Sequence, residues 1–314
     1  MRKILSHLAA SGLAVLVVMG DSPLRAEPPE GWRLVFNDEF NGDELDAAKW
    51  NTTMAFIGTH GPRYHNEYYA SYTLDENAIV ADGVLRLRTD RRTHEGAEAP
   101  GMFDYTQGLI SSHDKFAFTH GYIEIRAKYP GGKGLWPCLW LMPQHQGWPP
   151  EFDIAEYYSS SRTMHRGLAH GELYDSKWDS TWDAENDVED GWHIFALEWM
   201  PGRAVWSVDC IPRKVINADY VPNVAMYLVL SNSVSSRFGP SGEPDKTTVF
   251  PNDFAIDYVR VYQAPPANEP ALIVAENDMP PAKSEPLATD DALMPESMPP
   301  STVEKPVDPS ELTD

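Results

Sequence analysis

The sequence is poor in cysteine, in basic residues and in long apolar runs, and each shortage excludes a class of protein. Two Cys in 314 residues exclude a disulfide scaffold and a cysteine-rich zinc module. Only 25 Lys and Arg stand against 47 Asp and Glu, giving a net charge of −22, so nucleic acid is not an expected partner. Hydrophobic residues make up 42% of the chain, which is enough for the core of one large domain or two small ones.

The N-terminus has the pattern of a secretory signal. Basic residues at positions 2 and 3 precede an apolar run from Leu8 to Met19, which is too short for an ordinary membrane span, and Ala26 is a suitable cleavage residue. We therefore expect residues 1–26 to be removed, a secreted or periplasmic location, and no membrane contact afterwards. An uncleaved interfacial anchor is the alternative. No Cys follows the run to carry a lipid.

The last 51 residues, 264–314, differ from the rest in composition. They hold 11 Pro, 11 Asp or Glu, two Lys and no aromatic residue. Such a segment buries too little apolar surface to offset the entropy lost on ordering. We expect a disordered, acidic, Pro-rich tail after one folded domain over residues 27–263.

Within that domain, apolar and polar residues alternate as in strands with one buried face. In the segment 121–128, Ile123 and Ile125 would face a core while Glu124 and Arg126 face away. An Asp-Gly pair at positions 82 and 83, between two such runs, predicts a hairpin. No clean helical stripe exceeds about 12 residues, so the predicted fold class is all-β, a sandwich of two antiparallel sheets. Further strands are expected at Trp32–Phe36, Leu135–Met142, Phe152–Tyr157, His193–Trp199, Ala204–Val208, Met226–Leu230 and Ala255–Tyr262.

Three acids lie within six residues of one predicted strand, at Glu151, Asp153 and Glu156. Regular alternation would put Glu156 on the opposite face, but one extra residue in a β-bulge near Ile154 or Ala155 would return it to the face of the other two. Strand steps of roughly 3.3 Å then separate the two Glu backbones by about 13 Å, and inward-leaning side chains leave the carboxyl groups about 5 Å apart. This spacing suits double displacement at a glycosidic bond.

Other interpretations of these acids are an exposed strand edge that deters aggregation and a calcium site, although no EF-hand spacing is present. Aromatic residues near the acids favour a carbohydrate site, because sugar rings pack their C–H faces on such side chains. The ten His form no metal-binding motif, and most are interpreted as surface or loop residues. The neighbouring aromatic residues are Trp136, Trp140, Trp148, Tyr157 and Tyr158.

Taken together, these stretches resemble glycoside hydrolase family 16, which includes laminarinases, lichenases, agarases and carrageenases. The similarity covers essentially all of residues 32–263 in collinear order. It runs through Phe36–Phe40, Leu45–Trp50, Asn66–Tyr69, Asp82–Leu85, Gly121–Lys128, Gly134–Leu141, the three acids, His193–Trp199, Trp206–Asp209 and Asp257–Tyr262.

The resemblance implies a β-jelly-roll sandwich with a concave sheet forming a cleft, and endo-acting hydrolysis with retention. By the family's motif, Glu151 matches the nucleophile, Glu156 the acid/base, and Asp153 the residue that hydrogen-bonds to the nucleophile and tunes it. No cofactor is required for this chemistry. Residues expected to bind substrate or to lie on the cleft side are Asn66, Glu124, Arg126, Trp136, Trp140 and His170.

Many family members bind a structural calcium away from the cleft, and Glu39, the carbonyl of Gly83 and Asp257 match those positions. The alternative is that all three are ordinary turn or surface residues. The chain also departs from the family: Cys138 stands where Ala is usual and Cys210 where Gly is usual. In residues 230–236, Leu-Ser-Asn-Ser-Val-Ser-Ser replaces Leu-Asn-Leu-Ala-Val-Gly-Gly. Nothing in the pattern pairs the two cysteines, so we expect free thiols.

The leading functional prediction is an endo-β-glucanase acting on β-1,3 or mixed β-1,3/1,4 chains. A galactan hydrolase of the agarase type is the enzymatic alternative, and a non-catalytic glucan-binding protein of the same fold is the other. The expected partner is a polysaccharide substrate, and we expect the chain to act as a monomer.

Removal of the tail should leave the folded domain intact. Truncation after Gln263 is expected to leave the melting temperature and the turnover of soluble substrate nearly unchanged, because the removed segment contributes no aromatic residue to a core. Thermal melts of the full and truncated chains check this. A loss of several degrees would show that the tail docks on the domain.

Overall fold

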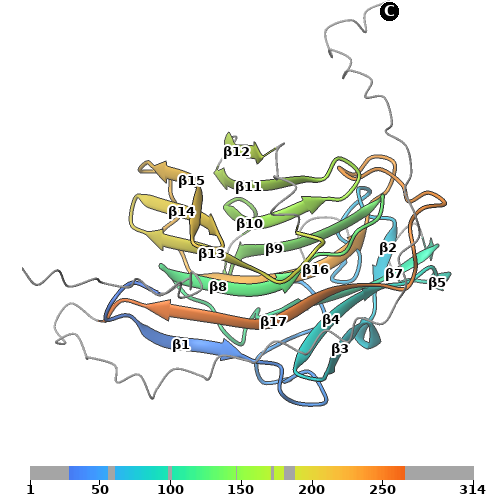
Figure 1. Cartoon of the computed structure of the whole chain (residues 1–314), viewed down its shortest axis with the longest axis horizontal. Coiled ribbons are helices and arrows are strands. Elements are labelled where there is room, and N and C mark those ends of the chain that lie inside the picture. Colours follow the sequence, from blue (N-terminus) through green and yellow to red (C-terminus); the bar gives the residue numbers. More distant parts are fainter. Residues whose placement is uncertain are drawn as a thin grey trace, which may run out of the picture. The chain divides into compact units, whose positions relative to one another are not determined.

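The computed structural model describes residues 28–55, 61–97, 101–145, 147–170, 173–179 and 188–265, and for residues 170–179 the backbone alone. The regular secondary structure of these residues consists of strands (Figure 1) and one short 3₁₀ helix, η1 (Asp75–Asn77). No helix within them is long and apolar enough to cross a membrane. The expected signal segment and residues 266–314 of the expected tail lie outside the described residues.

One sheet has eight strands, all antiparallel. In spatial order they are β15 (Ile211–Asn217), β14 (Arg203–Val208), β13 (His193–Met200), β8 (Gly121–Lys128), β17 (Asn252–Gln263), β4 (Val84–Thr89) and β3 (Ala78–Ala81), with β1 (Arg33–Asp38) also paired to β17.

The second sheet has seven strands, antiparallel except for the parallel pair β2 and β7. In spatial order they are β12 (Leu173–Asp179), β11 (Thr163–His170), β10 (Glu151–Tyr158), β9 (Leu135–Pro143), β16 (Met226–Val234), β7 (Tyr105–Ser111) and β2 (Ser71–Thr73). A separate two-stranded ribbon pairs β5 (His94–Glu95) with β6 (Met102–Phe103).

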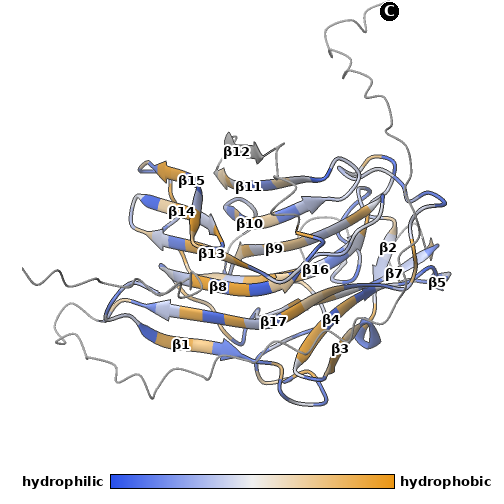
Figure 2. Cartoon of the chain, viewed as in Figure 1, coloured by the Kyte–Doolittle hydropathy of each residue, from blue (hydrophilic) through white to orange (hydrophobic). Residues whose placement is uncertain are grey.

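The main hydrophobic core lies between the two sheets. Ile123 and Ile125 of β8 belong to the same buried cluster as Leu139 and Leu141 of β9. Figure 2 shows the corresponding alternation of hydrophobic and hydrophilic residues along the strands. Full burial of each such side chain contributes about 1.5–3 kcal/mol, so the sandwich is held mainly by these alternating positions.

The seven-stranded sheet has a second face, which points away from this core and which we call the site face. The site face carries a second apolar cluster. On β9 the side chains of Trp136, Cys138 and Trp140 belong to this second cluster, whereas Leu139 and Leu141 belong to the core. Every residue of β9 is consequently buried. A strand buried on both faces holds its side chains in fixed positions, which suits a site that needs defined geometry.

All the strands expected from alternation are present, with ends that differ by up to four residues. The strands not expected include β7, β11 and β15. Strand β11 contains His165, Arg166 and Gly167, so its sequence lacks the alternation of apolar and polar residues that predicts a strand. His165 and Arg166 are buried only because of contacts made in the tertiary structure. The predicted hairpin at positions 82 and 83 joins β3 to β4, and both turn residues have positive φ, 55° for Asp82 and 73° for Gly83.

The turn between β14 and β15 has the same backbone conformation without glycine. Asp209 has φ 49° and Cys210 φ 67°, a region that L-residues other than Gly adopt at a cost of about 1–2 kcal/mol. Asp209 has a compensating role, because its carboxylate accepts hydrogen bonds from the backbone N–H of Ile194 at 2.9 Å and from His193 Nδ1 at 2.7 Å.

Cys210→Gly should therefore stabilise the fold. Gly removes the backbone strain, but it also raises the entropy of the unfolded chain, which costs about 0.5–1 kcal/mol. The expected net gain in stability is about 0.5–1 kcal/mol, or about 1–4 °C in melting temperature. Asp209→Gly is the matched control, and it should not stabilise because it removes two hydrogen bonds. An unchanged or lower melting temperature for Cys210→Gly would contradict the strain argument.

Candidate active site

Strand β10 carries the candidate acids on the site face because it contains a bulge. Between Asp153 and Glu156, β10 has one residue more than β11, and its pairing with β9 shifts between Asp153 and Ala155. Ile154 and Ala155 are consecutive residues and both lie in the main core. Glu156 is thereby returned to the face of Asp153, as the bulge predicted from the sequence requires.

Glu156 is held by three donors from three different residues. Trp136 Nε1 on β9 donates to Glu156 Oε1 at 3.1 Å, and the Tyr158 hydroxyl donates to Oε2 at 3.3 Å. His165 Nδ1 on β11 forms a short hydrogen bond to Oε2. With 7% of its surface exposed, this carboxyl group depends on such partners, because an unpartnered buried carboxylate is costly.

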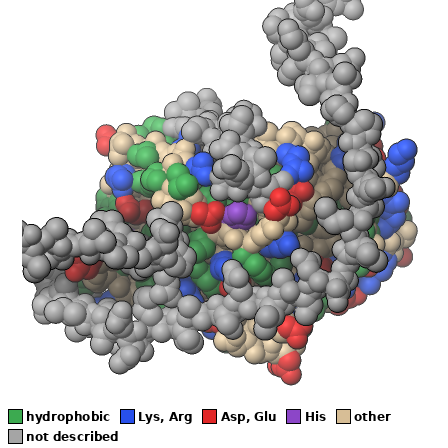
Figure 3. All heavy atoms as spheres, viewed as in Figure 1, with side chains coloured by type: hydrophobic (Ala, Val, Ile, Leu, Met, Phe, Trp, Pro, Cys, Tyr) green, Lys and Arg blue, Asp and Glu red, His purple; other side chains and the backbone are tan. Residues whose placement is uncertain are grey.

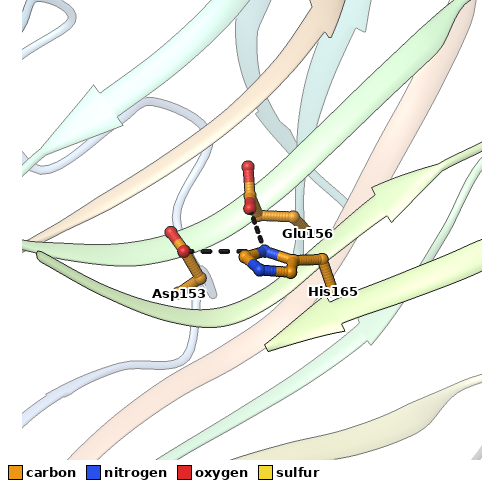
Figure 4. A group of neighbouring side chains, drawn as sticks. All are labelled: Asp153, Glu156 and His165. Atoms are coloured by element: carbon orange, nitrogen blue, oxygen red, sulfur yellow. Dashed lines mark hydrogen bonds and ion pairs between the residues drawn. The ribbon is translucent and has the colours of Figure 1, made fainter. Parts of the chain in front are cut away.

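His165 links two of the acids, and its place here was not expected from the sequence. Figure 4 shows its ring facing both Asp153 and Glu156, and its Nδ1 lies 3.6 Å from Asp153 Oδ2. Burial alone lowers the pKa of His165, but the bonded Glu156 and the nearby Asp153 raise it, and the net pKa is above the ordinary value. Gly167, opposite Asp153, leaves room for the ring, since a Cβ there would lie 3.0 Å from the imidazole.

Glu151 lies at the start of β10 and is more accessible than the other two acids. The indole Nε1 of Trp148, a residue that is 51% exposed, donates to Glu151 Oε2 at 2.8 Å. Burial and the carboxyl groups of Asp153 and Glu156 raise the pKa of Glu151, whereas the Trp148 hydrogen bond lowers it. Trp148 therefore favours the ionised form of this group.

Aromatic side chains border the acids. Tyr69 packs on Trp136 with ring centroids 4.8 Å apart, and the ring centroids of His65 and Trp140 are 6.3 Å apart. Asn66 is in the same loop, where its side chain accepts a hydrogen bond from the backbone of Tyr68, and the loop thus brings Asn66 next to two residues that contact the tryptophans. Among the described residues, the buried Trp140 Nε1 has no hydrogen-bond partner, so it can serve a bound ligand.

Neither cysteine forms a disulfide, as expected. Cys138 is 4% exposed on β9 and its Sγ lies 3.7 Å from Glu156 Oε1. Burial and the neighbouring acids raise the pKa of the Cys138 thiol. The cysteine that replaces the usual Ala is thus part of the floor beside Glu156.

The prediction that Glu124 and Arg126 line the same cleft is wrong. Both residues are on β8, in the eight-stranded sheet, on the face that points away from the core. Glu124 accepts a 2.7 Å hydrogen bond from the Tyr258 hydroxyl, and Arg126 donates to Asp257 at 2.8 Å. The core separates them from the acids of β10. Alternation shows which side chains share a face of a strand, but it does not show which of two sheets the strand joins.

The residues expected to hold calcium meet along β17. Glu39 follows the end of β1, and Gly83 directly precedes β4. Because β1 and β4 both pair with β17, these positions lie next to Asp257 of that strand. The carboxylate of Glu39 accepts two hydrogen bonds from Arg260, each at 2.9 Å, and Asp257 is bonded to Arg126. These hard oxygen donors suit calcium, but an ion there would share each carboxylate with an arginine.

His170 is the last residue of β11, and its side chain lies outside the described residues, so its contact with substrate stays a prediction.

On the face viewed in Figure 3, acidic side chains lie close to Lys and Arg side chains. On this face the acidic side chains do not form one uninterrupted surface.

Two carboxyl groups lie on one face of the bulged strand. Glu151 accepts a hydrogen bond from the exposed Trp148, and Glu156 is enclosed among aromatic side chains. Two carboxyl groups in such different surroundings can divide the tasks of glycoside hydrolysis. One serves as the carboxylate and the other exchanges the proton. With its two-sheet sandwich, the chain has the architecture and the acids of a glycoside hydrolase.

Comparisons with known proteins agree. The sequence model described as glycosyl hydrolases family 16 matches residues 65–250, and the chain belongs to this family. It is similar to a "Beta-glucanase" of Rhodothermus marinus, with 28% identity over 83% of this chain and 96% of the relative. It is also similar to "Glucan endo-1,3-beta-glucosidase A1" of Niallia circulans, with 27% identity over 74% of this chain but only 38% of that relative's length.

Among solved structures, the catalytic domain of an endo-1,3-beta-glucanase (laminarinase) from Thermotoga petrophila is similar, with 30% identity and a TM-score of 0.65. The match covers 75% of this chain and 99% of that domain. The fold is accordingly the β-jelly-roll sandwich expected from the resemblance, and the chain is a glycoside hydrolase.

Trp148→Phe should move the acidic limb of the pH–rate profile to higher pH. Loss of the indole donor raises the pKa of Glu151, and fewer molecules then carry the carboxylate at low pH. A hydrogen bond of about 0.5–1.5 kcal/mol corresponds to about a two- to tenfold loss of kcat/KM on that limb. Trp192→Phe is the control, since Trp192 lies against Arg126 of the other sheet. An unmoved acidic limb in Trp148→Phe would contradict the role given to Trp148.

Proposed function

We propose that this chain is an endo-acting, retaining glucanase that hydrolyses β-1,3 or mixed β-1,3/1,4 linkages. The observation that carries the proposal is the bulge of β10, which puts Glu151 and Glu156 on one face with Asp153 between them. Relatives named as glucan hydrolases support the substrate class, including an "Endo-1,3-1,4-beta-glycanase ExsH" of Rhizobium meliloti that is 28% identical over 72% of this chain.

In the proposed mechanism, Glu151 attacks the anomeric carbon as a carboxylate. The bond to the leaving oxygen breaks while Glu156 transfers its proton to that oxygen, and a covalent glycosyl-enzyme forms. Water then gives its proton to Glu156 and displaces Glu151, so the anomeric configuration is retained. Trp136, Tyr158 and His165 hold the Glu156 carboxyl in place, and Trp148 favours the ionised form of Glu151.

A galactan hydrolase is the second candidate. A "Keratan-sulfate endo-1,4-beta-galactosidase" of Sphingobacterium multivorum is 27% identical over 74% of this chain. Release of reducing ends from laminarin, lichenan, agarose, carrageenan and xyloglucan distinguishes the candidates. Activity on laminarin or lichenan supports the glucanase, and activity restricted to agarose or carrageenan overturns the glucan assignment.

A non-catalytic glucan-binding role is the third candidate. The chain is 25% identical to "Gram-negative bacteria-binding protein 3" of Drosophila melanogaster over 56% of its length. The presence of all three carboxyl groups and their hydrogen-bond partners in this chain favours catalysis. Binding of laminarin without release of reducing ends would instead support the binding role.

Substitution of the two glutamates should separate their roles. Glu151→Ala should reduce turnover to background while the protein stays folded, and azide should restore a product of inverted configuration. Glu156→Ala should reduce hydrolysis of the polysaccharide by about 10²–10⁴-fold and spare substrates with activated leaving groups, which need little protonation. NMR of the first product decides the stereochemistry, because an initial α-anomer from a β-linked chain contradicts both roles.

We also propose a structural calcium at Glu39, the Gly83 carbonyl and Asp257, on the basis of their meeting along β17. Calcium at 100 times its dissociation constant would stabilise the fold by about 2.7 kcal/mol, or about 5–10 °C in melting temperature. Thermal melts in Ca²⁺, in Mg²⁺ and in EDTA test this. Equal melting temperatures in Ca²⁺ and EDTA would show that the arginines alone neutralise these carboxylates.

The location and assembly state of the chain stay predictions. The signal-like sequence pattern of residues 1–26 supports a secreted or periplasmic enzyme, and this segment lies outside the described residues. The proposed partner is the polysaccharide alone, met by a monomer.

A further inference from the structure

The site face contains a cluster of side chains whose donor types also bind metal ions. One ligand atom each from Asp153, Glu156 and His165 lies within 4.8 Å of the others (Figure 4), and all three residues are buried. The thiol of Cys138 is next to them, because Cys138 is the direct partner of Glu156 in the pairing of β9 with β10. Carboxylate, imidazole and thiol are the donor set that zinc takes in proteins.

Two of the distances between these donors match those around a tetrahedral ion. Zinc bonds of about 2.0–2.2 Å to N and O, and about 2.3 Å to S, place neighbouring ligand atoms about 3.3–3.6 Å apart. His165 Nδ1 lies 3.6 Å from Asp153 Oδ2, and Cys138 Sγ lies 3.7 Å from Glu156 Oε1. His165 and Glu156 are hydrogen-bonded to each other, and an ion that replaces the shared proton would separate the two atoms.

The charge around the cluster also favours a cation. Two carboxyl groups belong to it, and a third, that of Glu151, is near enough to raise the pKa of the Cys138 thiol. A coordinating thiol loses its proton to become a ligand, so the bound ion would be held by both hard and soft donors. Calcium and magnesium prefer oxygen atoms alone, and zinc, cobalt and copper accept the mixed set.

We propose that Asp153, Glu156, His165 and Cys138 form a binding site for Zn²⁺ and similar transition-metal ions on the site face. Binding releases the protons of the Cys138 thiol and of the His165–Glu156 pair to solvent. The ion then holds Glu156 as a carboxylate that cannot protonate a leaving group, so the metal is an inhibitor that competes with substrate. The inhibition rests on the proposed function, whereas the binding does not.

Calorimetric titration of the metal-free full chain with ZnCl₂ tests the site. His165→Gln should weaken the binding at least tenfold, because it removes one of the four ligands. His193→Gln is the matched control: it breaks a similar contact, between His193 and Asp209, in the other sheet, and should leave the affinity unchanged. Equal affinities for the wild type and His165→Gln would overturn the site, and circular dichroism of each variant checks that it is folded.

Co²⁺ provides a second test that needs no change to an acid or a histidine. The Co²⁺-loaded wild type should show a thiolate-to-metal charge-transfer absorption. Cys138→Ala should abolish this band, and Cys210→Ala should keep it, since Cys210 lies in the turn between β14 and β15. Absence of the band in the wild type, or its persistence in Cys138→Ala, would overturn the assignment of the thiol ligand.

Kinetics test the overlap with the active site. Micromolar Zn²⁺ should raise KM for laminarin without changing kcat, EDTA should reverse the effect, and equal concentrations of Ca²⁺ or Mg²⁺ should not reproduce it. Tight Zn²⁺ binding without inhibition would overturn the overlap. A chain that binds Zn²⁺ through His165 but hydrolyses no polysaccharide would refute the proposed function and leave the metal site standing.

Discussion

The bulge at Ile154 is the constraint on which the rest of the site depends. A regular strand would send Glu156 into the apolar core between the sheets, where an ionised carboxylate would lose its hydration. The bulge instead directs two consecutive apolar residues, Ile154 and Ala155, into the core and returns Glu156 to the face of Asp153. The same irregularity thus completes the core on one side of β10 and gathers the carboxyl groups on the other. Core packing and chemistry are set by one residue of register.

Gathering three carboxyl groups has an electrostatic cost, and the neighbouring residues meet it with indole and phenol donors and one imidazole rather than with an arginine or a lysine. Trp136 and Tyr158 donate to Glu156, Trp148 donates to Glu151, and His165 lies between Asp153 and Glu156. An arginine at the centre would hold the acids permanently ionised, which would prevent one of them from carrying a proton. Neutral indole and phenol donors orient a carboxyl group and still permit it to change protonation state. This combination suits a pair of acids that must differ in charge during one reaction.

Much of this could be predicted from the sequence, because the information is local. Alternation located β8, β10 and β17, the Asp-Gly pair located the β3–β4 turn, and the spacing of the acids required the bulge. His165 could not be found in this way, since β11 lacks a clean apolar period and the ring is buried only by its contacts with β10. The prediction that Glu124 lines the cleft failed for a related reason. Its strand was predicted correctly, but pairing with distant strands decides which sheet a strand joins. Local patterns specify faces, and long-range pairing specifies which face meets the substrate.

The departures from the family pattern gain meaning when they are placed on these faces. Strand pairing puts His165, Glu156, Cys138 and Ser231 in one row across β11, β10, β9 and β16. Cys138 and Ser231 both replace usual family residues and both are buried, Cys138 directly beside Glu156 and Ser231 one strand further along the row. Asn232, the next departure along β16, points the other way and donates to the backbone carbonyl of Leu87 at 2.9 Å. One group of changes therefore adjusts packing between the sheets. The other places a thiol next to Glu156 and a hydroxyl one strand further along the site face, where they alter the shape and chemistry that a ligand meets there.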